Sequence, residues 1–155
     1  MIVLELNAKA CMSHLLLKPT FHRFAFISGE VTTYNKFHID GYLHKDFFDE
    51  KPEREYSYWK EVQEFFLAVI RGKRTPLNFK IILSLAPGDT KAFLLRHEIS
   101  YRPEEVQGLY LNLHYDGQTL QCITGTSMNT FTMDKSLEHE WDKSVQDFFA
   151  HKIET

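Results

Sequence analysis

Apolar residues recur along the chain at two spacings, and each spacing predicts a different kind of element. Four segments, which begin near Asn7, Ser57, Asp89 and Ser136, have apolar positions three and four residues apart. This spacing places side chains on one face of a helix, so we expect four amphipathic helices. Their apolar faces consist of Ala8, Cys11, Met12, Leu15 and Leu16; of Trp59, Val62, Phe65, Phe66, Val69 and Ile70; of Phe93 with its neighbours; and of Leu137, Trp141, Val145 and Phe148.

Apolar and polar residues alternate between positions 109 and 124, which predicts a β-hairpin. Its turn is Asp116-Gly117, a favoured pair for a two-residue type I′ turn. That turn sets Leu113 opposite Leu120, and apolar residues then meet apolar residues along one face of the hairpin.

A second hairpin follows the first helix. A two-residue loop would mix polar and apolar residues on each face, whereas a three-residue loop at 34–36 keeps the faces separate, and we prefer it. In this register Gly29 faces Gly41, which leaves room for the close approach of another element. The same register sets Glu30 directly opposite Asp40.

The order of elements indicates a single α+β domain over residues 1–155. A further apolar strand is predicted over 79–85. Residues 2–44 and 79–133 then share the order strand, helix, strand, strand, which suggests an internal duplication. We therefore predict two antiparallel strand-helix-strand-strand units with two additional long helices.

Composition narrows the class of protein further. The chain has 155 residues, of which 43% are hydrophobic and 14% aromatic, as expected of one globular domain with a large core or a binding face. A net charge of −3 argues against a free-standing nucleic-acid binder. Cys11 and Cys122 form no metal-binding pattern, and the start of the chain has no basic leader or long apolar run. We expect a cytoplasmic protein with reduced cysteines and no contact with a membrane.

The second hairpin offers one candidate metal site. Like charges directly opposite each other destabilise a strand pair, so Glu30 and Asp40 need compensation in the predicted register. His38 and His44 project from the same face, and these four side chains could hold a divalent cation such as zinc or manganese. The alternative is that a nearby cation such as Lys45 neutralises the acids, or that they point into water.

The polar face of the hairpin at 109–124 is a candidate interaction face. Exposed sheet faces usually carry charges, but this one carries none. Either the helix at 136–151 covers it or a partner does, and we expect the chain's own helix. An uncharged, partly aromatic surface is otherwise suited to protein association. The face consists of Tyr110, Asn112, His114, Thr119, Gln121 and Ile123.

Enzyme motifs are missing from the sequence. The stretch 124–127 has hydroxyl groups but no nucleophile elbow, and His139-Glu140 lacks the second histidine of a zinc protease. Neither a phosphate-binding loop nor a dinucleotide fingerprint occurs.

The chain resembles a family of small uncharacterised proteins from Gram-positive gut anaerobes in four stretches, Tyr56–Trp59, Gly72–Leu77, Gly108–Gly117 and Asp134–His139. That resemblance implies no activity. The repeated strand-helix-strand-strand order is also similar to the half-domains of DNA sliding clamps, in which basic helices face DNA. This clamp-like architecture implies a nucleic-acid contact through Lys9, Lys18, Lys91 and Arg96.

Three functions follow as hypotheses. We expect a non-catalytic binding or assembly module that associates with itself or with a protein partner. The first alternative is a metal-dependent enzyme that uses the acidic and histidine face. The second is a clamp-like accessory protein that binds nucleic acid in a salt-sensitive manner.

Overall fold

The computed structural model describes residues 1–72 and 74–153. The described residues form four α-helices, α1 (Ala8–Leu16), α2 (Trp59–Ile70), α3 (Pro87–Arg96) and α4 (Ser136–Lys152). They also form seven strands, β1 (Val3–Leu6), β2 (Ala25–Thr32), β3 (Lys36–Asp40), β4 (Ser57–Tyr58), β5 (Asn78–Ser84), β6 (Val106–Tyr115) and β7 (Leu120–Met128). Short 3₁₀ turns occupy Pro19–Phe21, Lys45–Phe47 and Pro103–Glu105. The predicted α+β class is confirmed.

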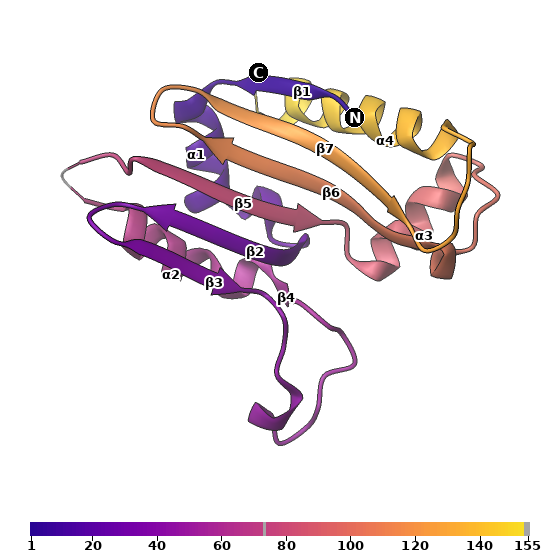
Figure 1. Cartoon of the computed structure of the whole chain (residues 1–155), viewed down its shortest axis with the longest axis horizontal. Coiled ribbons are helices and arrows are strands. Elements are labelled where there is room, and N and C mark those ends of the chain that lie inside the picture. Colours follow the sequence, from indigo (N-terminus) through magenta and orange to yellow (C-terminus); the bar gives the residue numbers. More distant parts are fainter. Residues whose placement is uncertain (73, 154–155) are drawn as a thin grey trace.

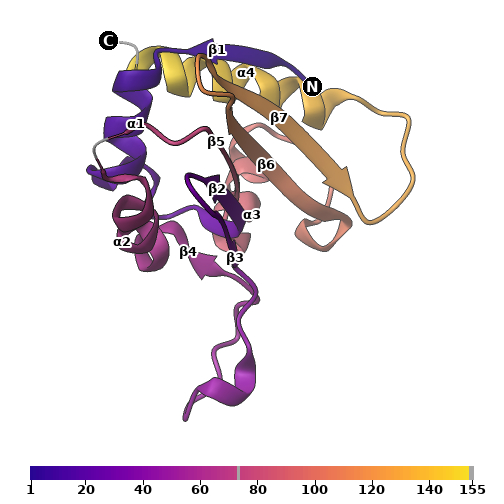
Figure 2. The ribbon, with the colours of Figure 1, turned by 60° about the vertical axis from the view of Figure 1, so that its left-hand side comes forward.

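One antiparallel sheet organises the molecule. Its strand order is β1-β7-β6-β5-β2-β3, and the short β4 pairs with β2 beside this path. Helices α1, α2 and α4 lie behind the sheet in Figure 1, and Figure 2 shows the same arrangement from another angle. The predicted strand at 79–85 is central, as its apolar sequence requires, because β5 pairs with both β2 and β6.

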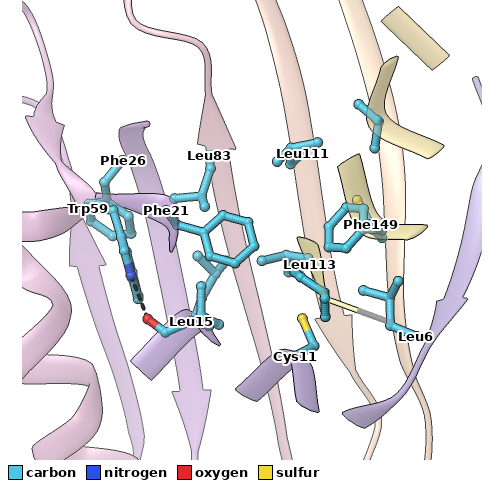
Figure 3. Close-up of a cluster of buried hydrophobic side chains, with 14 of the residues drawn as sticks. Leu6, Cys11, Leu15, Phe21, Phe26, Trp59, Leu83, Leu111, Leu113 and Phe149 are labelled. Atoms are coloured by element: carbon cyan, nitrogen blue, oxygen red, sulfur yellow. Dashed lines mark hydrogen bonds between the residues drawn. The ribbon is translucent and has the colours of Figure 1, made fainter. Parts of the chain in front are cut away.

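The core fills the space between the sheet and these helices. Figure 3 shows its aromatic and aliphatic side chains, which come from both layers. Trp59 and Phe21 are completely buried, and the Trp59 Nε1 donates a hydrogen bond of 2.7 Å to the Leu15 carbonyl. That bond ties the start of α2 to the end of α1 and satisfies a buried indole N–H.

The four predicted helices are present, with two differences. Asn7 caps α1 as expected, because its side chain accepts a hydrogen bond from the Ala10 amide. Helix α3 begins at Pro87 rather than at Asp89, since proline fits the first helical turn, where no amide partner is needed. The prediction that Phe65 packs in the core is wrong, because its side chain is 62% exposed.

The β6–β7 hairpin has the predicted faces but a different register. Leu113 pairs with Cys122 instead of Leu120, so the loop has four residues, 116–119. The Asp116 carboxylate explains the difference, because it accepts hydrogen bonds from the amides of Gln118 and Thr119 at 2.9 and 2.8 Å. An aspartate that bonds the amides following it stabilises a longer turn.

The β2–β3 hairpin has a three-residue loop, as expected, but at 33–35 rather than 34–36. Glu30 therefore pairs with His38, and the predicted opposition of Glu30 and Asp40 is wrong. The Thr33 amide closes the loop by donating to the Asn35 carbonyl at 2.9 Å.

The two glycines of this hairpin do not face each other, yet both allow a close approach. A Cβ at Gly29 would lie 2.4 Å from the Phe66 ring of α2. A Cβ at Gly41 would lie 1.8 Å from the carbonyl oxygen of Phe26. Close packing at the two positions is confirmed, although the contacts differ from the predicted pair.

The suggested duplication stays a prediction. In the sheet the first strand of each unit has a different place, because β1 is at an edge and β5 is in the centre.

Both cysteines are buried and form no disulfide. Burial, with a smaller contribution from nearby Cys11, raises the pKa of the Cys122 thiol to about 12, so this thiol is a poor nucleophile.

Candidate functional site

One face of the sheet has no helix over it in the part of the chain that the structure describes. Helix α4 packs against the opposite face, where its Asp142 carboxylate accepts a hydrogen bond from Thr124 of β7. Helix α2 packs there too, through the ring of Phe66 over Gly29. The expectation that the helix at 136–151 covers the predicted interaction face is therefore wrong. We call the uncovered side the open face.

Strand pairing aligns the open face into rows that cross the sheet. One row runs through Val3, Ile123, Asn112, Ile82, Ser28 and Asp40. The next runs through Glu5, Gln121, His114, Lys80, Glu30 and His38. The predicted interaction residues Tyr110, Asn112, His114, Gln121 and Ile123 all project from this face, on the neighbouring strands β6 and β7, so the structure brings them together.

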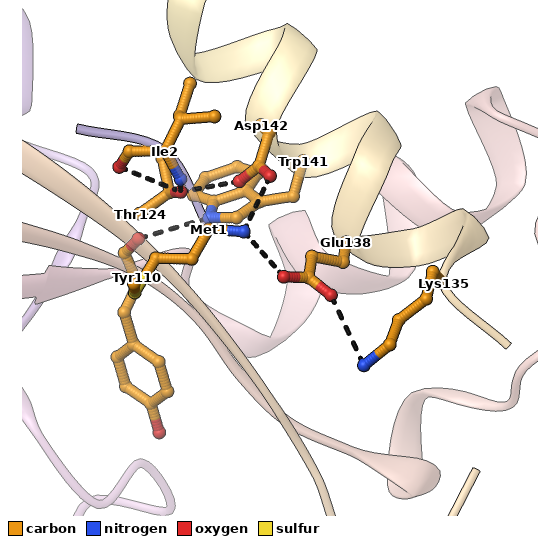
Figure 4. A network of polar contacts seen from close by, with 8 residues as sticks. All are labelled: Met1, Ile2, Tyr110, Thr124, Lys135, Glu138, Trp141 and Asp142. Atoms are coloured by element: carbon orange, nitrogen blue, oxygen red, sulfur yellow. Dashed lines mark hydrogen bonds and ion pairs between the residues drawn. The ribbon is translucent and has the colours of Figure 1, made fainter. Parts of the chain in front are cut away.

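Tyr110 is the large side chain at one end of the open face. A Cβ at Gly108 would lie 2.3 Å from its ring, so the ring occupies the space that this glycine leaves. Figure 4 shows the ring pointing away from α4, while the Tyr110 carbonyl accepts a 3.1 Å hydrogen bond from Trp141 Nε1. Burial, with a smaller contribution from Tyr56, raises the pKa of the Tyr110 phenol. The group is therefore neutral at physiological pH.

Charged residues lie around the uncharged centre of the open face, and some of them are paired while others are not. Glu30 lies 3.4 Å from Lys36 Nζ and 3.6 Å from His38 Nδ1, so this acid is compensated within the β2–β3 hairpin. Glu5 and Lys80, by contrast, form no ion pair with any described residue. They belong to one row, with two neutral positions between them.

The predicted metal-binding residues do not form a site in the described residues, which hold no group of three or more potential ligands able to bind a metal ion. Asp40 pairs with Ser28, and its side chain accepts a hydrogen bond from the Tyr42 amide at 3.0 Å. The ring of His44 packs edge-on against the ring of Tyr42, 5.6 Å away. Of the four residues, the observed register brings only Glu30 and His38 together, and it moves Asp40 from its predicted place opposite Glu30 to a place opposite Ser28.

A pocket of about 400 Å³ lies on the helix side of the molecule. We call it the aromatic pocket, because Phe24, Phe93, Trp141 and Phe148 form much of its wall. Phe93 and Trp141 meet edge-to-face with ring centroids 5.6 Å apart, and Phe24 and Phe148 do so at 6.1 Å. The remaining lining residues are Pro19, Thr20, Arg23, Leu85, Asp89, Ala92, Arg96, Leu111, Ser144 and Val145.

The aromatic pocket has charged groups in its lining. Arg23 donates to Asp89 at 2.8 Å and joins the segment before β2 to α3. The Arg96 guanidinium, in the last turn of α3, has no hydrogen bond or ion pair with any residue that the structure describes. Four segments far apart in the sequence build this pocket, and no local motif indicates it. Sequence reasoning therefore missed it.

The predicted nucleic-acid-binding residues are all exposed. Lys9 and Lys18 belong to α1 and its C-terminal end, while Lys91 and Arg96 belong to α3. Figures 1 and 2 show these two helices apart from each other on the molecule. Contact with nucleic acid stays a prediction.

A polar network joins β1, β7 and α4 at the β1 edge of the sheet, on the helix side (Figure 4). The Thr124 hydroxyl donates to Asp142 at 2.5 Å and accepts from the Ile2 amide at 2.9 Å. The Met1 amino group lies 2.9 Å from Asp142 and 2.5 Å from Glu138. The buried Asp142 carboxylate is thus satisfied, as a charge in a protein interior must be. We assign this network to the structure of the edge, where it holds β1 in the sheet.

The fold and its surface define a class: a single-sheet α+β domain with helices on one face of the sheet and a second face that no described helix covers. The chain belongs to the family described as "Family of unknown function (DUF5721)", which matches residues 14–154. This confirms the resemblance to an uncharacterised family; the origin in Gram-positive anaerobes and the likeness to sliding clamps stay predictions. Lys73, within one of the resembling stretches, lies outside the described residues.

No curated protein and no solved structure matches the chain. Among the described helices, none has both the length and the apolar composition needed to cross a bilayer.

Proposed function

We propose that the chain is a non-catalytic assembly module that pairs with a second copy of itself through the open face. The observation that carries the proposal is the uncharged centre of a sheet face that no described helix covers. Half-buried apolar side chains, Ile82 and Ile123, lie there beside Asn112 and Tyr110. A surface with an apolar centre and a charged rim is typical of protein interfaces.

The charges on the open face favour a second copy as the partner. An interface between identical chains with two-fold symmetry must be complementary to itself. A two-fold axis along the strands, between β6 and β7, exchanges these strands and also exchanges β1 with β5. Glu5 of one copy then lies opposite Lys80 of the other, and symmetry forms this pair twice. These are the two charges of the row that have no partner within the described chain.

The dimensions of sheets agree with this arrangement. Two sheets pack face to face at a separation of about 10 Å, which extended lysine and glutamate side chains can span. Neutral residues, His114 and Gln121, would meet at the axis.

We also place the module in the cytoplasm, a location that two buried cysteines without a disulfide support.

Charge reversal tests the proposal. Glu5→Lys and Lys80→Glu are each expected to weaken self-association at least about tenfold, because each creates two facing pairs of like charge. The double variant is expected to recover most of the affinity, since it restores opposite charges across the interface. Sedimentation velocity over a range of concentrations measures the dissociation constant.

Glu64→Lys is the matched control, because it makes the same charge change on an exposed position of α2, on the opposite side of the sheet. Circular dichroism verifies that each variant is folded. A chain that stays monomeric at every concentration, or single reversals that the double variant does not rescue, would contradict the proposed pairing.

A further inference from the structure

We propose that the aromatic pocket binds a small aromatic carboxylate. The site lies on the helix side, away from the open face, so it is independent of self-association. Its volume of about 400 Å³ is within the usual range for pockets that hold small molecules. The wall and the charged groups each limit the chemistry of the ligand.

The wall favours a flat, apolar body. Phe93, Trp141 and Leu111 are almost fully buried, so their positions are fixed by the core and the pocket is largely preformed. The indole N–H of Trp141 already donates to the Tyr110 carbonyl, which leaves no unsatisfied donor on that side chain. Phe24 and Phe148, which also line the pocket and are only partly buried, offer their ring faces and edges to a further ring.

The charged groups favour an anion. Three charged side chains line the pocket, Arg23, Asp89 and Arg96. Arg23 and Asp89 neutralise each other across 2.8 Å, and the remaining net charge is that of the Arg96 guanidinium. Guanidinium groups bind carboxylates through two parallel hydrogen bonds. The Ser144 hydroxyl, which also lines the pocket, has no hydrogen bond to a described residue and can donate to the same anion.

Other acids near α3 do not satisfy Arg96. Glu140 of α4 lies 3.1 Å from His97 Nδ1 and is not part of the pocket lining. A ligand carboxylate would therefore supply the opposite charge that Arg96 lacks among the described residues. A ring attached to that carboxylate would extend between the aromatic side chains.

Calorimetric titration with indole-3-carboxylate and with its neutral amide tests the assignment. The carboxylate is expected to bind at least about tenfold more tightly than the amide, because only the carboxylate pairs with Arg96. Arg96→Gln is expected to remove this preference. Ser144→Leu, which fills the pocket from α4, is expected to abolish the binding of both compounds.

Lys91→Gln provides the matched control, since it removes the same charge from an exposed position of α3 that does not line the pocket. It is expected to leave the preference unchanged. The assignment is overturned if neither compound binds the unmodified chain, if the two bind equally, or if Lys91→Gln and Arg96→Gln have the same effect. The melting temperature of each variant shows that it remains folded.

Discussion

Replacing Trp59 with alanine is expected to lower the free energy of unfolding by about 4 kcal/mol. The side chain is completely buried, and it packs against Phe26 and Phe66 with ring centroids 5.8 and 5.2 Å away. Its loss would leave a cavity where α1, α2 and the sheet meet. The Leu15 carbonyl would keep a second donor, Gln63 Nε2 at 2.9 Å, so the cavity rather than the lost hydrogen bond dominates the cost.

Urea unfolding measures this effect, with Phe65→Ala as the control. Phe65 is in the same helix but is 62% exposed, so its truncation is expected to cost within about 0.5 kcal/mol. Equal losses for the two variants would show that α2 does not face the sheet through Trp59 and Phe66.

Replacing Gly41 with alanine is expected to destabilise the chain by about 2 kcal/mol. The new Cβ would lie 1.8 Å from the carbonyl oxygen of Phe26, and backbone cannot yield as a flexible side chain does. Gly41 also joins two segments, because its amide donates to the Ile27 carbonyl and its carbonyl accepts from the Ser57 amide. A shift at Gly41 would disturb both contacts beside the bulge of β2.

Thermal and urea unfolding of Gly88→Ala give the comparison. Gly88 is in α3, and a Cβ there meets no atom within 4 Å. That substitution is expected to be neutral or to raise stability by up to about 1 kcal/mol, because alanine favours a helix over glycine. If Gly41→Ala were equally harmless, the close approach of Gly41 to β2 would be refuted.

Side-chain periodicity was sufficient to predict the four helices and the longer strands with their faces, but not the short strand β4. The residues of the β6–β7 hairpin that were expected on its polar face do project from the open face. Periodicity could not predict which face of the sheet the helices cover. Strand β6 has leucines on one face and Tyr110 on the other, and a helix can pack against either kind of face. The leucine side decides the outcome, since it continues across β5 and β7 as one apolar layer.

Strand register was less predictable, because a shift of two positions preserves the faces. Both hairpins moved in this way relative to the prediction. At Asp116, side-chain hydrogen bonds to the turn amides stabilise the longer loop. In the β2–β3 hairpin, the observed register replaces a pair of like charges, Glu30 and Asp40, by the compatible pair of Glu30 and His38.

The aromatic pocket and the charge arrangement of the open face depend on tertiary structure. Arg23, Arg96 and Trp141 are far apart in the sequence, and their common pocket requires α3 and α4 to pack together. Glu5 and Lys80 likewise share a row only because β7 and β6 lie between β1 and β5. Sequence patterns within a single element carry no information about either arrangement.

Crosslinking through a single new cysteine tests the proposed pairing most directly. In the proposed dimer the two copies of residue 114 lie beside the axis, about 10 Å apart across the interface. His114→Cys, treated with a short bis-maleimide, is therefore expected to give a covalent dimer on denaturing electrophoresis. The native thiols are buried and do not compete. A His114→Cys chain that stays monomeric, or that crosslinks no more than Glu64→Cys on α2 at the same concentration, would contradict pairing through the open face.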